Sequence, residues 1–180
     1  ADGSAEFALG KEISLSSSNK QDSVIPPLTT HSPSQDRGVY GRDKEIGEVS
    51  AAVQKYPLLV VAGLAGIGKS WVINEALEFS LKGAYQIRRV RVEEGWGLAE
   101  IYSIMSADLG LNDQDYKMLP LLLKSGNCSQ LTKKAIKAGP VVFHMGRADY
   151  LFHDGHLIDQ SISEFFKILA DHVPNVRIIL

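Results

Sequence analysis

The sequence has little cysteine, no long apolar run, no secretory signal and little net charge. It holds a single cysteine, Cys128, so no internal disulfide can form, and we expect a reducing, cytoplasmic setting. No apolar run approaches the roughly 20 residues that a membrane helix needs, and no basic stretch followed by an apolar core marks a secretory signal. A formal net charge of −2 favours neither a nucleic-acid partner nor a membrane surface. These absences predict a cytoplasmic domain without membrane or nucleic-acid partners.

What is present divides the chain into two parts. Residues 1–36 are rich in Ser, Thr, Pro and other polar residues, and the first seven resemble an expression-vector remnant. Such a composition buries too little apolar surface to offset the entropy of ordering the chain. We therefore predict a linker or flexible arm over residues 1–36 and a folded domain over residues 37–180.

Apolar runs of strand length alternate with helical patterns in the second part. Continuous apolar runs, typical of buried strands, span residues 57–62, 141–145 and 176–180, and alternation predicts a further strand over residues 85–92. Helical spacing predicts helices over residues 43–54, 69–81, 98–109, 131–138 and 158–172, with a weaker pattern over 116–123. This succession predicts an α/β fold with a mostly parallel sheet between helical layers.

The segment GLAGIGKS, residues 63–70, follows the first of these buried strands and leads into a helix. It matches the P-loop pattern G-x-x-x-x-G-K-[ST], also called Walker A. Its glycines let backbone N–H groups curl around an anion, and the following helix adds unpaired amides and the positive end of its dipole. Lys69 supplies a cation for the β and γ phosphates, and the Ser70 hydroxyl can bind Mg²⁺. The strand–loop–helix context predicts that this phosphate loop binds a nucleotide.

A second motif precedes the phosphate loop. The segment VYGRDKEI, residues 39–46, resembles a motif of NB-ARC domains, the nucleotide-switch modules of the STAND class of P-loop NTPases. The resemblance covers residues 39–180 and implies a three-layer P-loop NTPase fold that binds ATP or ADP with Mg²⁺. It favours adenine, and no guanine-reading NKxD-type motif is present. By this match Val39, Tyr40 and Arg42 are candidates for contacts with the base and sugar, although Asp43 also suits a plain helix N-terminus. The candidate nucleotide-binding set is completed by Gly63, Ala65, Gly66, Ile67, Gly68, Lys69, Ser70 and Trp71.

The chain departs from the family pattern at the strand over residues 141–145. There the family has an apolar strand ending in one or two carboxylates, which hold Mg²⁺ through water and orient the attacking water. His144 and Met145 stand in those positions, and neither is the hard oxygen ligand that Mg²⁺ prefers. Asp149 is the nearest acid, and it either swings in to act with Lys69 in catalysis or caps a turn. We expect bound nucleotide with slow or absent hydrolysis.

Three other features of the sequence each allow a structural and a functional interpretation. His153 and His156 flank a glycine turn, which suits a solvated turn better than a metal site. Trp96, between two glycines, either closes the core or is a contact point. Three arginines, which either protect a sheet edge or form a basic patch, alternate along the strand over residues 85–92: Arg88, Arg89 and Arg91.

These observations leave three functions open. The first is a regulatory nucleotide switch of a STAND signalling protein, which controls oligomerisation through contacts with other domains of the parent protein. The second is an interaction scaffold that keeps its nucleotide as a structural cofactor. The third is a true ATPase that recruits Asp149. We rank them in this order because the strand-end carboxylate is missing while Lys69 and Ser70 are intact.

The resemblance also predicts an open sheet edge. It implies a five-stranded parallel core of which this chain supplies four strands, with the last core strand lying beyond Leu180. Without that strand, the apolar strand over residues 57–62 becomes an edge, which invites pairing with another strand. We expect the chain either to self-associate through this edge or to borrow a strand from residues 1–36.

Overall fold

The computed structural model describes residues 10–14, 41–153 and 156–180. These residues form a five-stranded sheet in the order β1-β2-β7-β4-β3, in which every neighbouring pair is parallel. The strands of this sheet are β1 (Gly10–Ser14), β2 (Leu58–Ala62), β3 (Gln86–Arg91), β4 (Val141–Gly146) and β7 (Val176–Ile179). The predicted α/β fold with a parallel sheet is confirmed.

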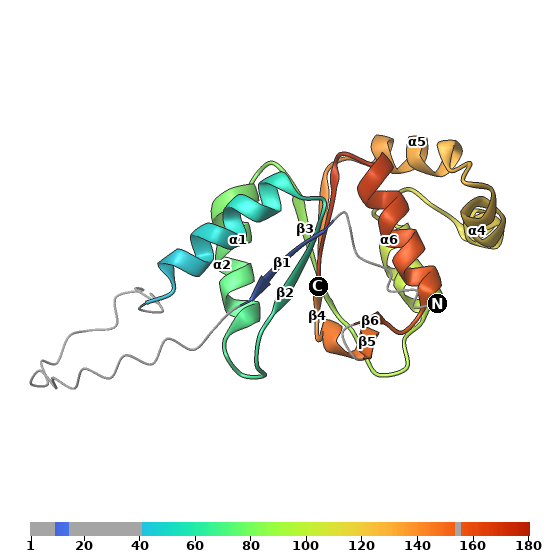
Figure 1. Cartoon of the computed structure of the whole chain (residues 1–180). Coiled ribbons are helices and arrows are strands. Elements are labelled where there is room, and N and C mark those ends of the chain that lie inside the picture. Colours follow the sequence, from blue (N-terminus) through green and yellow to red (C-terminus); the bar gives the residue numbers. More distant parts are fainter. Residues whose placement is uncertain (1–9, 15–40, 154–155) are drawn as a thin grey trace, which may run out of the picture.

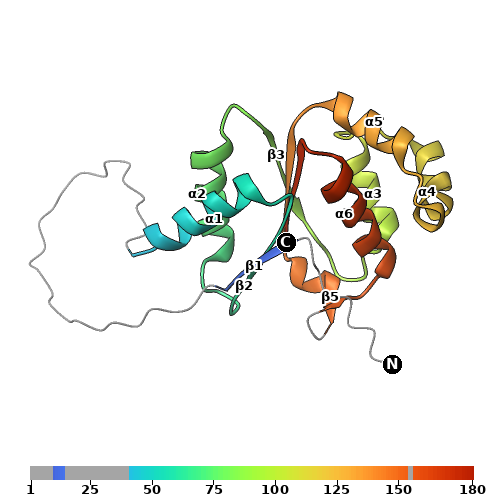
Figure 2. The ribbon, with the colours of Figure 1, turned by 45° about the horizontal axis from the view of Figure 1, so that its top comes forward.

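Helices cover both faces of the sheet, so the domain has three layers (Figure 1). Two helices, α1 (Asp43–Lys55) and α2 (Lys69–Leu81), lie on one face, which we call the α1–α2 side. The other face, the α3–α6 side, carries the remaining helices, and Figure 2 shows the same division from a second direction. These helices are α3 (Leu98–Ser106), α4 (Asp113–Ser125), α5 (Ser129–Ala138) and α6 (Gln160–His172).

Each face of the sheet has its own apolar core. On the α1–α2 side, Leu59 and Val142 of the sheet pack against buried residues of both helices, such as Val49 and Leu77. On the α3–α6 side the core is larger and rich in aromatic rings. Phe143 of β4 packs there with residues of α3 and α6. Because neighbouring residues of a strand face opposite sides, the continuous apolar runs of β2, β4 and β7 are what a sheet covered on both faces requires.

Strand β1 lies at the edge of the sheet, beside β2. Its five residues pair with β2 in parallel, from Gly10 with Leu58 to Ser14 with Ala62, and Ile13 is buried against the α1–α2 core. For these residues the expectation of a linker gives way to a strand, because the edge of β2 offers unpaired backbone groups. The pairing is the second of the two outcomes that we expected for this edge. The rest of residues 1–36 lies outside the described residues.

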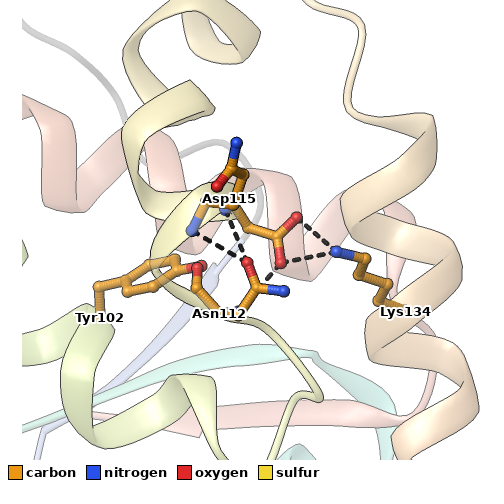
Figure 3. Close-up of polar contacts among 5 residues, drawn as sticks. Tyr102, Asn112, Asp115 and Lys134 are labelled. Atoms are coloured by element: carbon orange, nitrogen blue, oxygen red, sulfur yellow. Dashed lines mark hydrogen bonds and ion pairs between the residues drawn. The ribbon is translucent and has the colours of Figure 1, made fainter.

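Helix α4 is longer than the weak pattern over residues 116–123 suggested. It begins at a capping box in which the Asn112 side chain accepts from the N–H of Gln114 and Asp115, while the Asp115 carboxylate accepts from the N–H of Asn112 (Figure 3). The same carboxylate pairs with Lys134 of α5 through both oxygens, at 2.6 and 2.8 Å. The hydroxyl of Tyr102 on α3 donates to the carbonyl of Asn112 at 2.9 Å. One small network thus ties α3, α4 and α5 together.

The other features noted in the sequence lie as follows. β3 is the edge strand opposite β1, and two of its arginines make ion pairs: Arg88 with Asp108, which follows α3, and Arg89 with Glu78 of α2. Arg89 also bonds Asn74 of α2. A short hairpin of β5 (Phe152–His153) and β6 (His156–Leu157) precedes α6. Trp96 packs against the α3–α6 core. None of the helices in the described ranges is long and apolar enough to cross a membrane.

Candidate nucleotide-binding site

The phosphate loop joins the carboxyl end of β2 to the start of α2. Gly66 and Gly68 have φ angles of 76° and 91°, which residues with a side chain seldom adopt, so the glycines of this motif are required by the backbone path. No atom lies within 4 Å of where a Cβ of either glycine would stand, so a ligand can approach the backbone. Gly63, Ala65, Gly66 and Gly68 are all exposed.

The first turn of α2 supplies amide donors to this loop. Gly68 is the N-terminal cap residue and has no side chain to offer, and in the described part of the chain no side chain accepts from the N–H groups of Lys69, Ser70 or Trp71. The first bond of the helix runs from Val72 N–H to the Gly68 carbonyl at 3.0 Å. Unpaired amides at the positive end of a helix are suited to an anion. The geometry fits a phosphate group.

Lys69 is folded over its own loop. Its ammonium group donates to the carbonyls of Gly63 and Leu64 at 2.6 and 3.0 Å. These are neutral acceptors, and a phosphate would replace them with a charged one, which makes a stronger bond. The predicted role of Lys69 as the cation for phosphates is therefore compatible with its position.

Arg42 joins the segment before α1 to the phosphate loop. Its guanidinium pairs with Glu45 at 2.9 Å and donates to the Ile67 carbonyl at 3.3 Å. Backbone hydrogen bonding, and then Arg42, lower the pKa of the Glu45 carboxyl, so the pair is charged at neutral pH. Arg42 therefore lies beside the phosphate loop, and its contact with the base and sugar stays a prediction. Val39 and Tyr40 fall outside the described residues.

The end of β4 is apolar where the family pattern has carboxylates. His144 is 5% exposed and Met145 is 2% exposed. Burial, helped by the charge of Arg89, lowers the pKa of His144 to about 4, so its ring is neutral at physiological pH. Its Nδ1 has no hydrogen-bond partner among the described residues. Neither side chain offers an oxygen to a metal ion.

The strand register shows how deep His144 lies. Leu59 of β2 pairs with Ile179 of β7, and Ile179 pairs with His144 of β4. His144 is therefore level with Leu59, inside the sheet, and Arg147 directly follows Gly146, the last residue of β4. No motif in the sequence marks Arg147.

Asp149 lies in η1 (Ala148–Leu151), a 3₁₀ turn directly after β4, and is exposed. The Asp149 carbonyl accepts from Phe152 N–H, as in a turn. Within the described residues no hydrogen bond or ion pair joins its carboxylate to the phosphate loop. The loop after β4 and the phosphate loop do lie along the same edge of the sheet (Figure 1). Lys69 and Ser70 begin α2, and Arg42 bonds the loop that precedes it, whereas a role for Asp149 at this site stays a prediction.

The residues fit nucleotide phosphates better than they fit a metal held by carboxylates. The exposed Ser70, in the first turn of α2, carries a hydroxyl that suits Mg²⁺, but β4 ends without an oxygen ligand. No group of three or more His, Cys, Asp or Glu that could hold a metal occurs in the described residues. Cys128 is buried, and burial raises the pKa of its thiol, which keeps it unreactive.

The family of the chain follows from a comparison with protein-family models. The family model described as Novel STAND NTPase 6 matches residues 39–180. The chain belongs to this family, and the match supports a nucleotide-binding STAND NTPase domain. No curated protein and no solved structure matches. The STAND class is confirmed, whereas the narrower resemblance to NB-ARC domains stays a prediction.

Proposed function

We propose that this domain is an adenine-nucleotide switch module of a STAND-type signalling protein, with weak or absent hydrolysis. One contrast carries the proposal. The phosphate loop retains Lys69, Ser70 and open amides on α2, whereas buried His144 and Met145 occupy β4 where the family pattern has carboxylates. Such a site can hold phosphates but has no strand-end carboxylate to orient water.

A switch requires the nucleotide to favour one arrangement of the protein over another. The Arg42 bond to the Ile67 carbonyl gives a physical route for this, because it couples α1 to the phosphate loop. Phosphate binding that moves the loop would strain or release that bond, and α1 would transmit the change. In this proposal α1 presents the change to other domains of the parent protein or to a second copy, in the cytoplasm. Adenine is proposed because of the NB-ARC resemblance.

A slow ATPase that recruits Asp149 is the second candidate, because that carboxylate is exposed at the same edge of the sheet. One preparation tests both functions. The purified protein is denatured, released nucleotide is identified by chromatography, and phosphate release is measured on the wild type, Lys69→Ala and Asp149→Ala. Asp171→Ala, which removes an exposed acid at the end of α6, is the matched control.

For the switch we expect co-purified ADP or ATP that is absent from Lys69→Ala, and turnover no higher than in that variant. Phosphate release that falls with both Lys69→Ala and Asp149→Ala, but not with Asp171→Ala, would establish the ATPase instead. A wild type that neither carries nor binds adenine nucleotide would refute the proposal altogether. Nucleotide that never exchanges or turns over would point to a scaffold with a structural cofactor.

A further inference from the structure

The residue directly after β4 has an unusual backbone conformation. Arg147 has φ 60° and ψ 36°, and it is the one residue other than glycine with positive φ in the described ranges. For a residue with a long side chain this left-handed conformation is strained, and such strain persists only where the surroundings enforce it. Here the conformation turns the chain from β4 into η1 at the edge of the sheet.

Among the described residues, the Arg147 side chain contacts Tyr150. Its guanidinium carbon lies 4.3 Å from the centre of the Tyr150 ring, and the guanidinium also donates to the Tyr150 hydroxyl. A cation held against an aromatic face loses rotamer freedom without losing its charge. In the described chain no carboxylate forms an ion pair with Arg147, and the residue is exposed. The guanidinium is therefore ordered, charged and open to an anion.

The register places this cation at the edge of the sheet where the phosphate loop lies. His144 is level with Leu59 through Ile179, β4 ends two residues later at Gly146, and β2 ends three residues later at Ala62. Arg147 directly follows the end of β4, as Gly63 of the loop directly follows the end of β2. The parallel strands β2, β7 and β4 bring these positions to one edge, where Lys69 and the first amides of α2 also lie. The carboxylate positions of β4 are taken by His144 and Met145, and the first charged side chain after them is the guanidinium of Arg147. A guanidinium can bind phosphate directly and in a bidentate manner.

We propose that Arg147 binds the terminal phosphate of the nucleotide in place of a carboxylate-held metal, so that ATP binding by this domain depends little on Mg²⁺. The inference rests on the proposed function, since it assumes a nucleotide in the phosphate loop. Tyr150 acts as the positioning residue that holds the guanidinium toward the edge of the sheet. The γ-phosphate is the group that gains from Arg147, which distinguishes ATP from ADP at this site.

The test measures binding of ATP and ADP by calorimetry, each with Mg²⁺ and with EDTA, on the folded protein. Arg147→Gly is the main variant, because glycine tolerates positive φ and the variant removes only the side chain. Arg91→Ala is the matched control, since Arg91 is an exposed arginine on β3 whose backbone pairs with Gly146, next to Arg147. Arg147→Lys keeps the charge but loses the planar fork.

We expect wild-type affinity for ATP to change by less than about threefold when EDTA replaces Mg²⁺, and Arg147→Gly to lower it about tenfold or more, the size of a lost charged hydrogen bond. ADP affinity should fall by less than about threefold in that variant, Arg147→Lys should lie between the two, and Arg91→Ala should match wild type. ATP affinity that is unchanged in Arg147→Gly, or wild-type binding that disappears in EDTA, would overturn the proposal. If both happen while Lys69→Ala abolishes binding, nucleotide binding stands and only the role of Arg147 fails. A wild type that binds neither nucleotide overturns both.

Discussion

The two sides of the sheet use their polar groups in opposite ways. On the α3–α6 side, side chains close the ends of helices: Asn112 and Asp115 cap α4, and Lys134 and Tyr102 tie that cap to the neighbouring helices. On the α1–α2 side, α2 begins at Gly68 with its first amides bonded to no side chain in the described chain. The first amides of α4 are thus satisfied by side chains, whereas those of α2 remain open at the phosphate loop.

This difference separates residues that stabilise the fold from residues that serve a ligand. Open amides at the start of a buried helix cost stability, and they are retained where something binds to them. His144 lies on the α1–α2 side too, since it alternates with Phe143 of the other core, and it brings an unpaired ring nitrogen into that side. The α1–α2 side should therefore respond more strongly to pH and ligand than the α3–α6 side.

The largest expected effect comes from His144→Leu, measured as the free energy of unfolding at several pH values. The pKa of His144 is lowered from the usual 6.5 to about 4 in the fold. Between these values the unfolded chain binds a proton that the folded chain does not, so stability falls as pH falls through this window and is full above it. The difference corresponds to about 3 kcal/mol. In His144→Leu this part of the loss of unfolding free energy at low pH should disappear, because leucine binds no proton.

The control for that prediction is His172→Gln, because His172 is exposed at the end of α6. Urea unfolding near neutral pH and near pH 4.5 should show a steep loss of stability in wild type and in the control, and a shallower one in His144→Leu. Equal pH dependence in all three proteins would mean that the His144 ring is protonated inside the fold, and the comparison between the two sides would fail.

A smaller effect is expected on the α3–α6 side. Asp115→Ala removes a capping acceptor, worth about 1 kcal/mol, and a half-exposed ion pair worth up to about 1 kcal/mol. Asp115→Asn should keep the capping bond to Asn112 N–H and lose only the ion pair with Lys134, so it should cost about half as much. Thermal unfolding measures both, and nucleotide affinity should not change. A change in nucleotide affinity would show that the two sides are coupled.

The smallest expected effect on stability is at Gly68. Alanine at its φ of 91° should cost about 1 kcal/mol and weaken nucleotide binding, because the loop must distort. Gly47→Ala is the matched control, since Gly47 lies inside α1, has open space where its Cβ would stand and should gain about 0.5–1 kcal/mol. Opposite signs for the two glycines in thermal unfolding, with loss of binding only for Gly68→Ala, are the expected outcome. Equal effects would contradict it.

The sequence allowed much of this arrangement to be predicted where local pattern and final environment agree. The helix over residues 69–81 was predicted with the bounds that α2 has, because glycine ends the loop and apolar residues recur at helical spacing. Apolar runs predicted β2, β4 and β7, since central strands are buried on both faces. The loop between β2 and α2 was predicted from its glycine pattern, because the backbone of such a loop adopts φ angles that favour glycine.

Features that depend on tertiary contacts were harder to predict. Pro120 obscured the length of α4, although the capping residues Asn112 and Asp115 stood in the sequence as a signal. β1 has one buried apolar residue described, Ile13, and is a strand because β2 offers an edge. The left-handed turn at Arg147 follows from how β4 meets η1, which no short motif encodes.

The sheet order also sets how this chain can fold. β7 lies between β2 and β4, and Leu58 of β2 pairs with Ile178 of β7, so the centre of the sheet joins segments from far apart in the chain. Contacts of such long sequence separation form slowly, because the chain loses much entropy before they stabilise it. During synthesis β2 and β4 emerge first and must wait for the strand that joins them. Until β7 pairs with β2, the strand that precedes the phosphate loop lacks its neighbour in the sheet. Nucleotide binding should therefore appear only in the last step of folding.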